Sequence, residues 1–404
     1  MKQPTEPTEP TDPADPTEQP LDLLHSETEE DLRAAVRALL ADRAGHQAVL
    51  GRIETGDPYL PGLWKSLAAD MGAAGLLVPE KLGGQGASHR EAAVVLEELG
   101  RAVTPLPYLT SAVVATETLL ALAEGSQETG SQETRSQKAE DREAASQEVA
   151  GLLADLASGR TVAVLAVPLS TAPGAEFPPT VPGVPASDSV PGVADAVAAD
   201  LFLVPRADGL YAVPAAAATV VPQSPLDLTR PLATVTTGAG SGTRLAGPGA
   251  SRAAVRRGLL AGAGLLASEQ LGLAEWCLEE TVRYTRERHQ FNRPVGSFQA
   301  LKHRMAQLWL DLVGARAAAR AAADALATGR GDAPLLVAVA QAYCSRTAVR
   351  AAEECVQLHG GIGMTWEHPA HLALKRAKSD QIALGSAGRH QDAIAALVGL
   401  EPPR

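Results

Sequence analysis

The segment from residue 251 to residue 399 constrains the fold more than any other part of the chain. Apolar residues recur there at helical spacing with few interruptions, which predicts four or five helices packed as an antiparallel bundle. One interruption, Tyr284 to Gln299, reads YTRERHQFNRPVGSFQ and is polar, aromatic and broken by Pro and Gly. A break of this kind between two long helices predicts a ligand-binding corner of the bundle.

A second unusual segment, Gln357 to Gly363, reads QLHGGIG at the end of another predicted helix. Taken alone, His359 and the two glycines after it could be only a helix C-cap. In the same way, Arg288 of the first segment could simply pair with a carboxylate on the helix surface. Three later residues are predicted to serve packing and capping: Trp366, Glu367 and His368.

Residues 161 to 248 follow a different pattern, which predicts a small antiparallel β domain. Short runs rich in Val and Leu (VAVLAV, LFLVP, LYAV, ATVV and LDLTRPLATV) are separated there by Gly, Pro and Asp. Gly238, Gly240 and Gly242 resemble a dinucleotide-binding loop, but no βαβ unit surrounds them, so we predict a hairpin loop.

The region before the strands, residues 25 to 160, has the periodicity of an N-terminal helical domain. Ser88 and Glu91 have the spacing of a capping box at the start of one helix. Residues 124 to 150 contain the near-repeat GSQETGSQETRSQKA and are predicted to be an exposed low-complexity insertion. Residues 1 to 24 repeat Thr-Glu-Pro and Thr-Asp-Pro units, which predicts a disordered tail.

Composition excludes several classes of function. The net charge of −12, without a cluster of Lys and Arg, argues against binding to nucleic acid. No apolar run is long enough to span a membrane, and the first residues do not have the pattern of a secretory signal. The three cysteines, Cys277, Cys344 and Cys355, lack CxxC spacing and are predicted to be buried thiols in a cytoplasmic protein.

Three stretches together resemble the acyl-CoA dehydrogenase family of flavoproteins, of an actinobacterial type, over about residues 27 to 400. They read LWKSLAADMGAAGLLVPEKLGGQG, RERHQFNRPVGSFQALKHRMAQ and QLHGGIGMTWEHPAHLALKRAK. The family has the same order of elements as the one predicted from the residues. The predicted fold class is therefore α+β, with an N-terminal helical domain (25–160), a small central antiparallel β domain (161–248) and a C-terminal bundle of four or five helices (249–404).

The resemblance implies FAD as cofactor, held between the β domain and the bundle and completed by a second subunit. Arg288 matches the arginine that contacts the FAD diphosphate from the neighbouring subunit, a role that suits a permanently charged bidentate donor. Asn292 replaces the usual Gly and tolerates the same turn conformation. The matching cofactor-binding positions are Arg288, Gln290, Phe291, Phe298, Gln299, Gln357, His359, Gly360, Gly361, Gly363, Gly385 and Ser386.

The usual catalytic base of the family has no counterpart in this chain. The family places a Glu shortly after an R-x-A-K segment; here Arg376 begins that segment and the Glu position is Leu384. The alternative position of the base, on the first bundle helix, corresponds to about Gly262. The nearest carboxylate on that helix is Glu269, a weak candidate, so the catalytic residue is unknown. The β domain also reads LAVPLSTAPG where the family has an acidic, Gly-rich flavin-contacting segment.

Three functional hypotheses follow from the resemblance. The first is a FAD-dependent acyl-CoA dehydrogenase that forms the α,β double bond of an acyl-CoA thioester, alone or as one subunit of a heteromer. The second is a catalytically degenerate subunit that completes the FAD site of a paralogue. The third and weaker one is a flavoprotein that oxidises something other than a thioester. The expected partners are an acyl-CoA, a second subunit of the same or a paralogous kind, and an electron-transfer flavoprotein.

Overall fold

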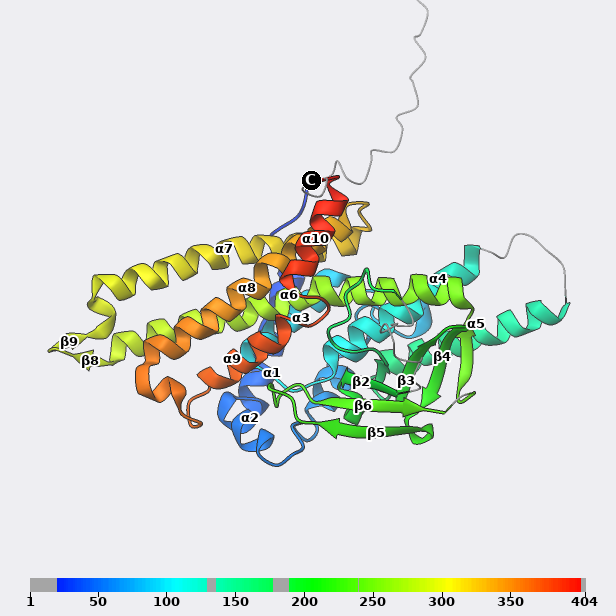
Figure 1. Cartoon of the computed structure of the whole chain (residues 1–404), viewed down its shortest axis with the longest axis horizontal. Coiled ribbons are helices and arrows are strands. Elements are labelled where there is room, and N and C mark those ends of the chain that lie inside the picture. Colours follow the sequence, from blue (N-terminus) through cyan, green and yellow to red (C-terminus); the bar gives the residue numbers. More distant parts are fainter. Residues whose placement is uncertain (1–19, 129–135, 177–188, 239, 401–404) are drawn as a thin grey trace, which may run out of the picture.

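The computed structural model of the chain describes residues 20–128, 136–176, 189–238 and 240–400. Figure 1 shows an elongated molecule, in which a long helical bundle carries the small hairpin β8–β9 at one end and the β-sheets towards the other. The helices of the N-terminal region pack against both the bundle and the β-sheets. The predicted fold class, helical region, small β domain and helical bundle, is confirmed.

The N-terminal region begins its main helices where the sequence provides caps. The predicted capping box is confirmed: the Ser88 hydroxyl accepts from the backbone at the start of α3, and the Glu91 carboxylate accepts from the Ser88 N–H. Ser26 and Glu29 form a second one at α1. The elements are α1 (Glu27–Arg43), α2 (His46–Ile53), η2 (Lys65–Asp70), η3 (Ala73–Gly75), η4 (Glu80–Leu82), α3 (His89–Ala102), η5 (Tyr108–Ala115), α4 (Thr116–Glu128) and α5 (Ser136–Ala157).

The β domain consists of two sheets, in the orders β1-β3-β4-β7 and β2-β6-β5, around a small apolar core that includes Phe202, Val213 and Val235. All its pairs are antiparallel except β1 with β3. The strands are β1 (Ala163–Leu165), β2 (Ser189–Ala194), β3 (Leu201–Arg206), β4 (Gly209–Pro214), β5 (Ala218–Gln223), β6 (Leu232–Thr237) and β7 (Thr243–Ala246), with η7 (Ala196–Ala198) and η8 (Ala215–Ala217) between them.

Two predictions about the β domain were wrong in detail. The glycines at 238–242 do not close a hairpin, because β6 and β7 belong to different sheets and the segment connects the two. The strand predicted from Leu226 begins only at Leu232, and residues 226–231 form a turn. Both errors have one cause: apolar alternation identifies a strand but does not say which strand it pairs with.

The C-terminal bundle contains α6 (Pro248–Glu287), α7 (Gln299–Thr328), α8 (Ala333–His359), α9 (Ala370–Asp380) and α10 (Ala387–Leu397), within the predicted number. The predicted corner is a hairpin, β8 (His289–Gln290) and β9 (Arg293–Pro294), followed by η9 (Val295–Ser297). Its two turn residues, Phe291 and Asn292, have φ angles of 52° and 60°, so the prediction that Asn292 tolerates a turn conformation is confirmed. A short 3-10 turn, η10 (Gly360–Met364), ends α8.

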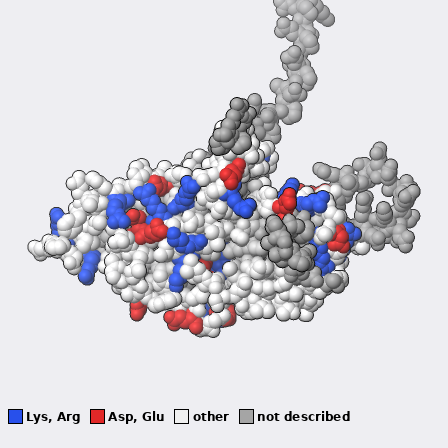
Figure 2. All heavy atoms as spheres, viewed as in Figure 1, with Lys and Arg blue, Asp and Glu red and all other residues white. Residues whose placement is uncertain are grey.

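The remaining predictions concern exposure and charge. All three cysteines are buried and free, as predicted. Among the described residues, no helix is long and apolar enough to cross a membrane. Of the low-complexity segment, residues 129–135 lie outside the described residues, as does most of the predicted tail, residues 1–19. On the face of the molecule seen in Figure 2, Lys and Arg side chains gather over the bundle with Asp and Glu side chains among them.

The contact between α3 and α6 depends on two glycines. A Cβ atom on Gly272 would lie 1.8 Å from the carbonyl oxygen of Glu97, and one on Gly100 would lie 2.0 Å from that of Glu269. The two backbones therefore touch, and a side chain at either position would force the helices apart. We expect Gly272→Ala to lower the free energy of unfolding by about 3 kcal/mol in chemical denaturation. Gly151→Ala in α5, where a Cβ meets nothing within 4 Å, should have no destabilising effect.

Candidate functional site

A small apolar cavity of about 30 Å³ lies where the β domain meets the bundle. Its walls come from η5, from β1 and the residues that follow it, from α6, and from Leu384 between α9 and α10. No carboxylate lines it among the described residues. A space of this size holds about one water molecule, so it does not admit an acyl group without rearrangement of its walls.

Leu384 closes this cavity in a backbone conformation that is unusual for its residue type. Its φ angle is 53°, its N–H donates to the carbonyl of Leu169 at 2.7 Å, and its own carbonyl accepts from Nε2 of His390 at 3.0 Å. A Leu in the left-handed region carries a conformational cost that the surrounding hydrogen bonds offset. The loop that would present a base is therefore held in a defined shape, with an apolar side chain at its tip.

Gly262 of α6 faces the same space as Leu384. A Cβ atom on Gly262 would lie 3.1 Å from Cδ1 of Leu384 and 2.6 Å from Cγ2 of Val114. Hence the two positions at which the family resemblance places a base, the loop position and the helix position, are neighbours in this structure. Apolar atoms of Leu384 and Val114 fill the space between them, and neither position offers a proton acceptor.

Glu269, the weak candidate for a base, lies in a buried ion-pair network that joins the β domain to the bundle. Arg230, in the turn before β6, donates to both carboxylate oxygens of Glu269 at 2.6 and 2.7 Å and to Asp380 at 3.0 Å. Arg376 of α9 donates to Glu269 and to Asp227, each at 2.6 Å. All five side chains are nearly inaccessible to solvent.

The charges in this network nearly balance, and they oppose proton uptake by Glu269. Burial alone would raise the pKa of Glu269, but Arg230 and Arg376 hold it below its usual range. Burial raises the pKa of Asp380 to about 8, and its second oxygen has no hydrogen-bond partner in the described structure. A general base needs a free lone pair and a pKa near the working pH. The surroundings of Glu269 therefore favour a structural role.

The Tyr284–Gln299 segment, which includes the hairpin β8–β9, lies at the far end of the bundle (Figure 1). Arg288 directly follows α6 and is exposed, and within the described structure its guanidinium forms no hydrogen bond or ion pair. Phe291 is 87% exposed at the hairpin tip. Of the other predicted residues there, Gln290 and Gln299 are exposed, and Phe298 is partly buried beneath the guanidinium of Arg293.

The Gln357–Gly363 segment lies at the same end of the bundle, because the ring of His359 stacks on Tyr284 with ring centroids 4.4 Å apart. Gln357 is exposed, and a Cβ on Gly360 or Gly361 would meet nothing within 4 Å, so the backbone is open to a ligand there. The His359 side chain, in contrast, is buried and points into the protein. Gly363 is buried, and a Cβ on it would lie 2.6 Å from the carbonyl of Val356.

The predicted cofactor-binding residues therefore fall into two separate groups. Gly385 and Ser386 belong to the cavity end, where Ser386 caps α10 by accepting from the N–H of Arg389. Arg288 and its neighbours form the other group. From Gly262, which lies next to the cavity residues Val114 and Leu384, α6 continues for 26 residues to Arg288, which is about 40 Å at a rise of 1.5 Å per residue. One flavin bound to a single chain does not reach both groups.

Comparison with known proteins agrees with this architecture. Two family models match: the N-terminal domain of acyl-CoA dehydrogenases over residues 26–135, and the C-terminal domain over residues 252–399. The acyl-CoA dehydrogenase IpdE2 of Mycolicibacterium smegmatis is 35% identical over 361 residues, covering 89% of this chain and 95% of that protein. IpdE2 of Mycobacterium tuberculosis is 35% identical over 353 residues, with coverages of 87% and 91%.

Solved structures show the same fold. A variant of the Tcur3481-Tcur3483 steroid ACAD is 26% identical, with a TM-score of 0.73 and coverage of 92% of this chain and 98% of that chain. Butyryl-CoA dehydrogenase from Megasphaera elsdenii has a TM-score of 0.72 at 19% identity, with coverages of 94% and 100%. Fold and matches together define the class, a FAD-dependent oxidoreductase acting on CH–CH groups. Within it, the chain belongs to the acyl-CoA dehydrogenase family.

Sequence reasoning missed two buried polar clusters. One is the network around Arg230 and Glu269. In the other, Asp195 follows β2 and accepts from the hydroxyls of Tyr59 and Thr110, each at 2.8 Å, which ties the N-terminal region to the β domain. The signal that was available is the set of three polar residues, Asp227, Thr229 and Arg230, within an apolar strand pattern. Its partners lie far away in sequence, so no local spacing identifies them.

Proposed function

We propose that the chain is the supporting subunit of a heteromeric FAD-dependent acyl-CoA dehydrogenase. In this proposal Arg288 and the turn at Gly360 and Gly361 hold the ADP half of an FAD whose flavin ring and acyl-CoA lie in a paralogous subunit. That paralogue supplies the carboxylate that removes the α-proton. The observation that carries the proposal is the small apolar cavity at Leu384, whose described lining residues include no base and whose volume of about 30 Å³ leaves no room for an acyl group.

The two ends of the chain differ in how well they fit FAD. At the bundle end, an unpaired exposed guanidinium, exposed amides and open glycine backbone suit phosphate and ribose oxygens. At the cavity end, the side chains of Leu384 and Val114 fill the space next to Gly262. When bound, FAD supplies the hydride acceptor of the reaction. This chain's residues then orient the cofactor across the subunit boundary and leave proton removal to the partner.

Similarity to a solved steroid ACAD supports the heteromer. That protein is named for two polypeptides, Tcur3481-Tcur3483, and its matched chain is 26% identical to this one. The reoxidising partner that we expect, an electron-transfer flavoprotein, rests on the family resemblance. An alternative is a homomeric dehydrogenase, in which opening of the cavity admits flavin and substrate to this same chain.

The visible spectrum separates the two proposals. We expect the chain purified alone to be colourless, and to carry FAD only when it is co-expressed with a family member that has the catalytic Glu. The complex should then hold one FAD for each pair of unlike subunits, and an acyl-CoA should bleach its flavin absorption. A yellow protein with one FAD per chain, bleached by an acyl-CoA without any partner, would establish the homomeric enzyme instead.

A further inference from the structure

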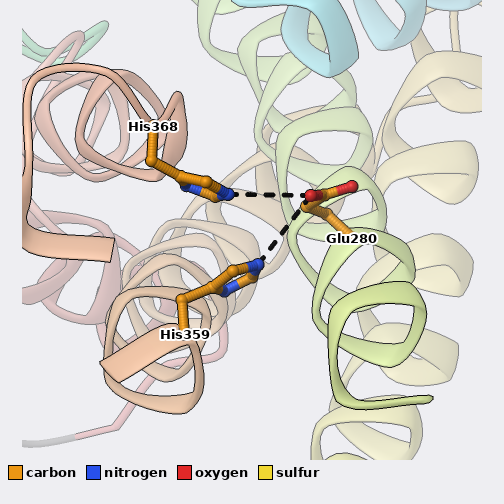
Figure 3. Close-up of side chains that lie close together, drawn as sticks. All are labelled: Glu280, His359 and His368. Carbon is orange, nitrogen blue, oxygen red and sulfur yellow. Dashed lines mark ion pairs between the residues drawn. The ribbon is translucent and has the colours of Figure 1, made fainter. Parts of the chain in front are cut away.

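Glu280, His359 and His368 converge on one point at the bundle end, although they come from three elements (Figure 3). Glu280 belongs to α6, His359 is the last residue of α8, and His368 lies in the loop before α9. Nε2 of His359 lies 3.8 Å from Oε1 of Glu280, and Nε2 of His368 lies 3.7 Å from the same oxygen. One ligand atom from each of the three side chains lies within 4.8 Å of the others.

Among the described residues, the nitrogen of His359 that faces this point has no hydrogen-bond partner. The ring is fully buried, and its Nδ1 lies 2.7 Å from the carbonyl oxygen of Cys355, which can only accept a hydrogen bond. Nδ1 therefore carries the proton, and in the neutral ring Nε2 presents a lone pair. Within the described structure, Nε2 makes no hydrogen bond. A buried lone pair directed at a carboxylate oxygen is unfavourable unless a cation lies between them. Burial lowers the pKa of His359, but contacts with Cys355 and Glu280 raise it to about 9, so that cation is either a proton on Nε2 or a metal ion.

We propose that Glu280, His359 and His368 bind a divalent transition-metal ion of the Zn²⁺ class. Two imidazole nitrogens and one carboxylate oxygen are a ligand set that suits this ion, with a fourth position left for water. The N–H of His359 donated to a backbone carbonyl is the arrangement typical of a metal-ligating histidine. Bonds of about 2.0–2.1 Å place tetrahedral ligand atoms about 3.4 Å apart. The two distances from Glu280 to the histidines therefore shorten by only a few tenths of an ångström, while the two histidine nitrogens, which lie within 4.8 Å of each other, approach by at most about 1.4 Å.

Binding of the ion leaves one neighbouring contact, Arg283 with Glu280, almost unchanged and breaks another, Ala370 with His368. Arg283 donates to both oxygens of Glu280, but each oxygen has a second lone pair, so one remains for the ion. His368 accepts from the N–H of Ala370 through Nδ1 at 3.2 Å, which matches the predicted capping role. To ligate through Nε2, His368 must carry its proton on Nδ1 and release that hydrogen bond. The first turn of α9 should therefore exchange its amide hydrogens faster when the ion is bound.

The position of the site gives the ion a structural task. It would join α6, the end of α8 and the loop before α9, and the turn η10 connects the last two along the chain. Under the proposed function this turn contacts FAD, but the metal inference stands without it, since it rests on the three side chains alone. The ion would hold the turn in place before any cofactor binds.

Equilibrium dialysis and visible absorption with Co²⁺, a coloured substitute for Zn²⁺, test the site on the untagged full chain without FAD. We expect one ion per chain, a visible band of four-coordinate Co²⁺ that Zn²⁺ abolishes, and a higher unfolding temperature with Zn²⁺. His368→Ala and Glu280→Gln should each weaken binding at least tenfold. The matched control is His371→Ala, which removes a histidine three residues away whose Nε2 contacts the carbonyl of Trp366 instead.

Three results would overturn the inference: no stoichiometric binding by the wild-type chain, binding that both variants retain, or binding that His371→Ala lowers equally. The first would mean that the three side chains share a proton and no metal. Should His368→Ala fail to fold, as judged by circular dichroism, the wild-type stoichiometry and Glu280→Gln still decide. If the assembled enzyme bound no FAD while this chain still bound Co²⁺, that result would count against the proposed function and leave the metal site standing.

Discussion

Glu269→Gln is expected to lower the free energy of unfolding by about 3–5 kcal/mol, the usual effect of removing one charged partner from a buried ion-pair network. For a chain of this length that corresponds to a fall of about 5 °C in the unfolding temperature. The physical reason is that Arg230 and Arg376 both donate to this carboxylate in a place that water does not reach. Gln keeps the shape and removes the charge, so two guanidinium groups lose their shared counter-ion.

Differential scanning calorimetry of the wild type and the variant measures this effect. Glu279→Gln on the same helix is the matched control, because its exposed carboxylate pairs with Arg101 at the surface, and such pairs contribute less than about 1 kcal/mol. A different outcome has a clear meaning. If Glu269→Gln kept the wild-type unfolding temperature but lost the bleaching of flavin by an acyl-CoA, Glu269 would be a catalytic base and the proposed division of labour would fail.

Local sequence patterns were sufficient for the long helices of the bundle and for the capped start of α3. Helical periodicity and the pair Ser88 and Glu91 act within one or two turns, and the structure follows them. The same holds for the left-handed turn at Asn292, where the residue type itself permits the conformation. The family motifs also identified both segments at the bundle end, although only the structure shows that the His359 side chain is buried away from the open glycine backbone.

Long-range contacts account for what the sequence did not predict. The parallel pairing of β1 with β3 and the partners of Glu269 join residues that are far apart in the chain. The sequence motif alone showed that Leu384 occupies the position of the family's Glu. That Gly262 faces Leu384 directly, and that Val114 fills the remaining space, depends on how η5, α6 and the loop after α9 pack together. Sequence thus identified a missing base, and structure adds that the space itself is small and apolar.

Arg288→Ala is expected to weaken FAD binding to the assembled heteromer by about 100-fold. Two charge-assisted hydrogen bonds from a guanidinium to a diphosphate contribute about 3 kcal/mol together, and Ala removes both. Arg288→Lys should recover only part of this loss, because an ammonium keeps the charge but not the bidentate geometry. Quenching of flavin fluorescence, with FAD titrated into the cofactor-free complex, measures the three dissociation constants.

The fold of this chain should tolerate both changes, because Arg288 is exposed and its guanidinium has no partner in the described structure. Arg256→Ala is the matched control: it removes an equal charge from an exposed position near the other end of α6 and should leave the FAD dissociation constant unchanged. The loss in Arg288→Ala should also shrink in high salt, since part of the attraction is screened. Wild-type affinity in Arg288→Ala would show that the bundle end of this chain does not hold the cofactor, and the proposed sharing of FAD between unlike subunits would have to be abandoned.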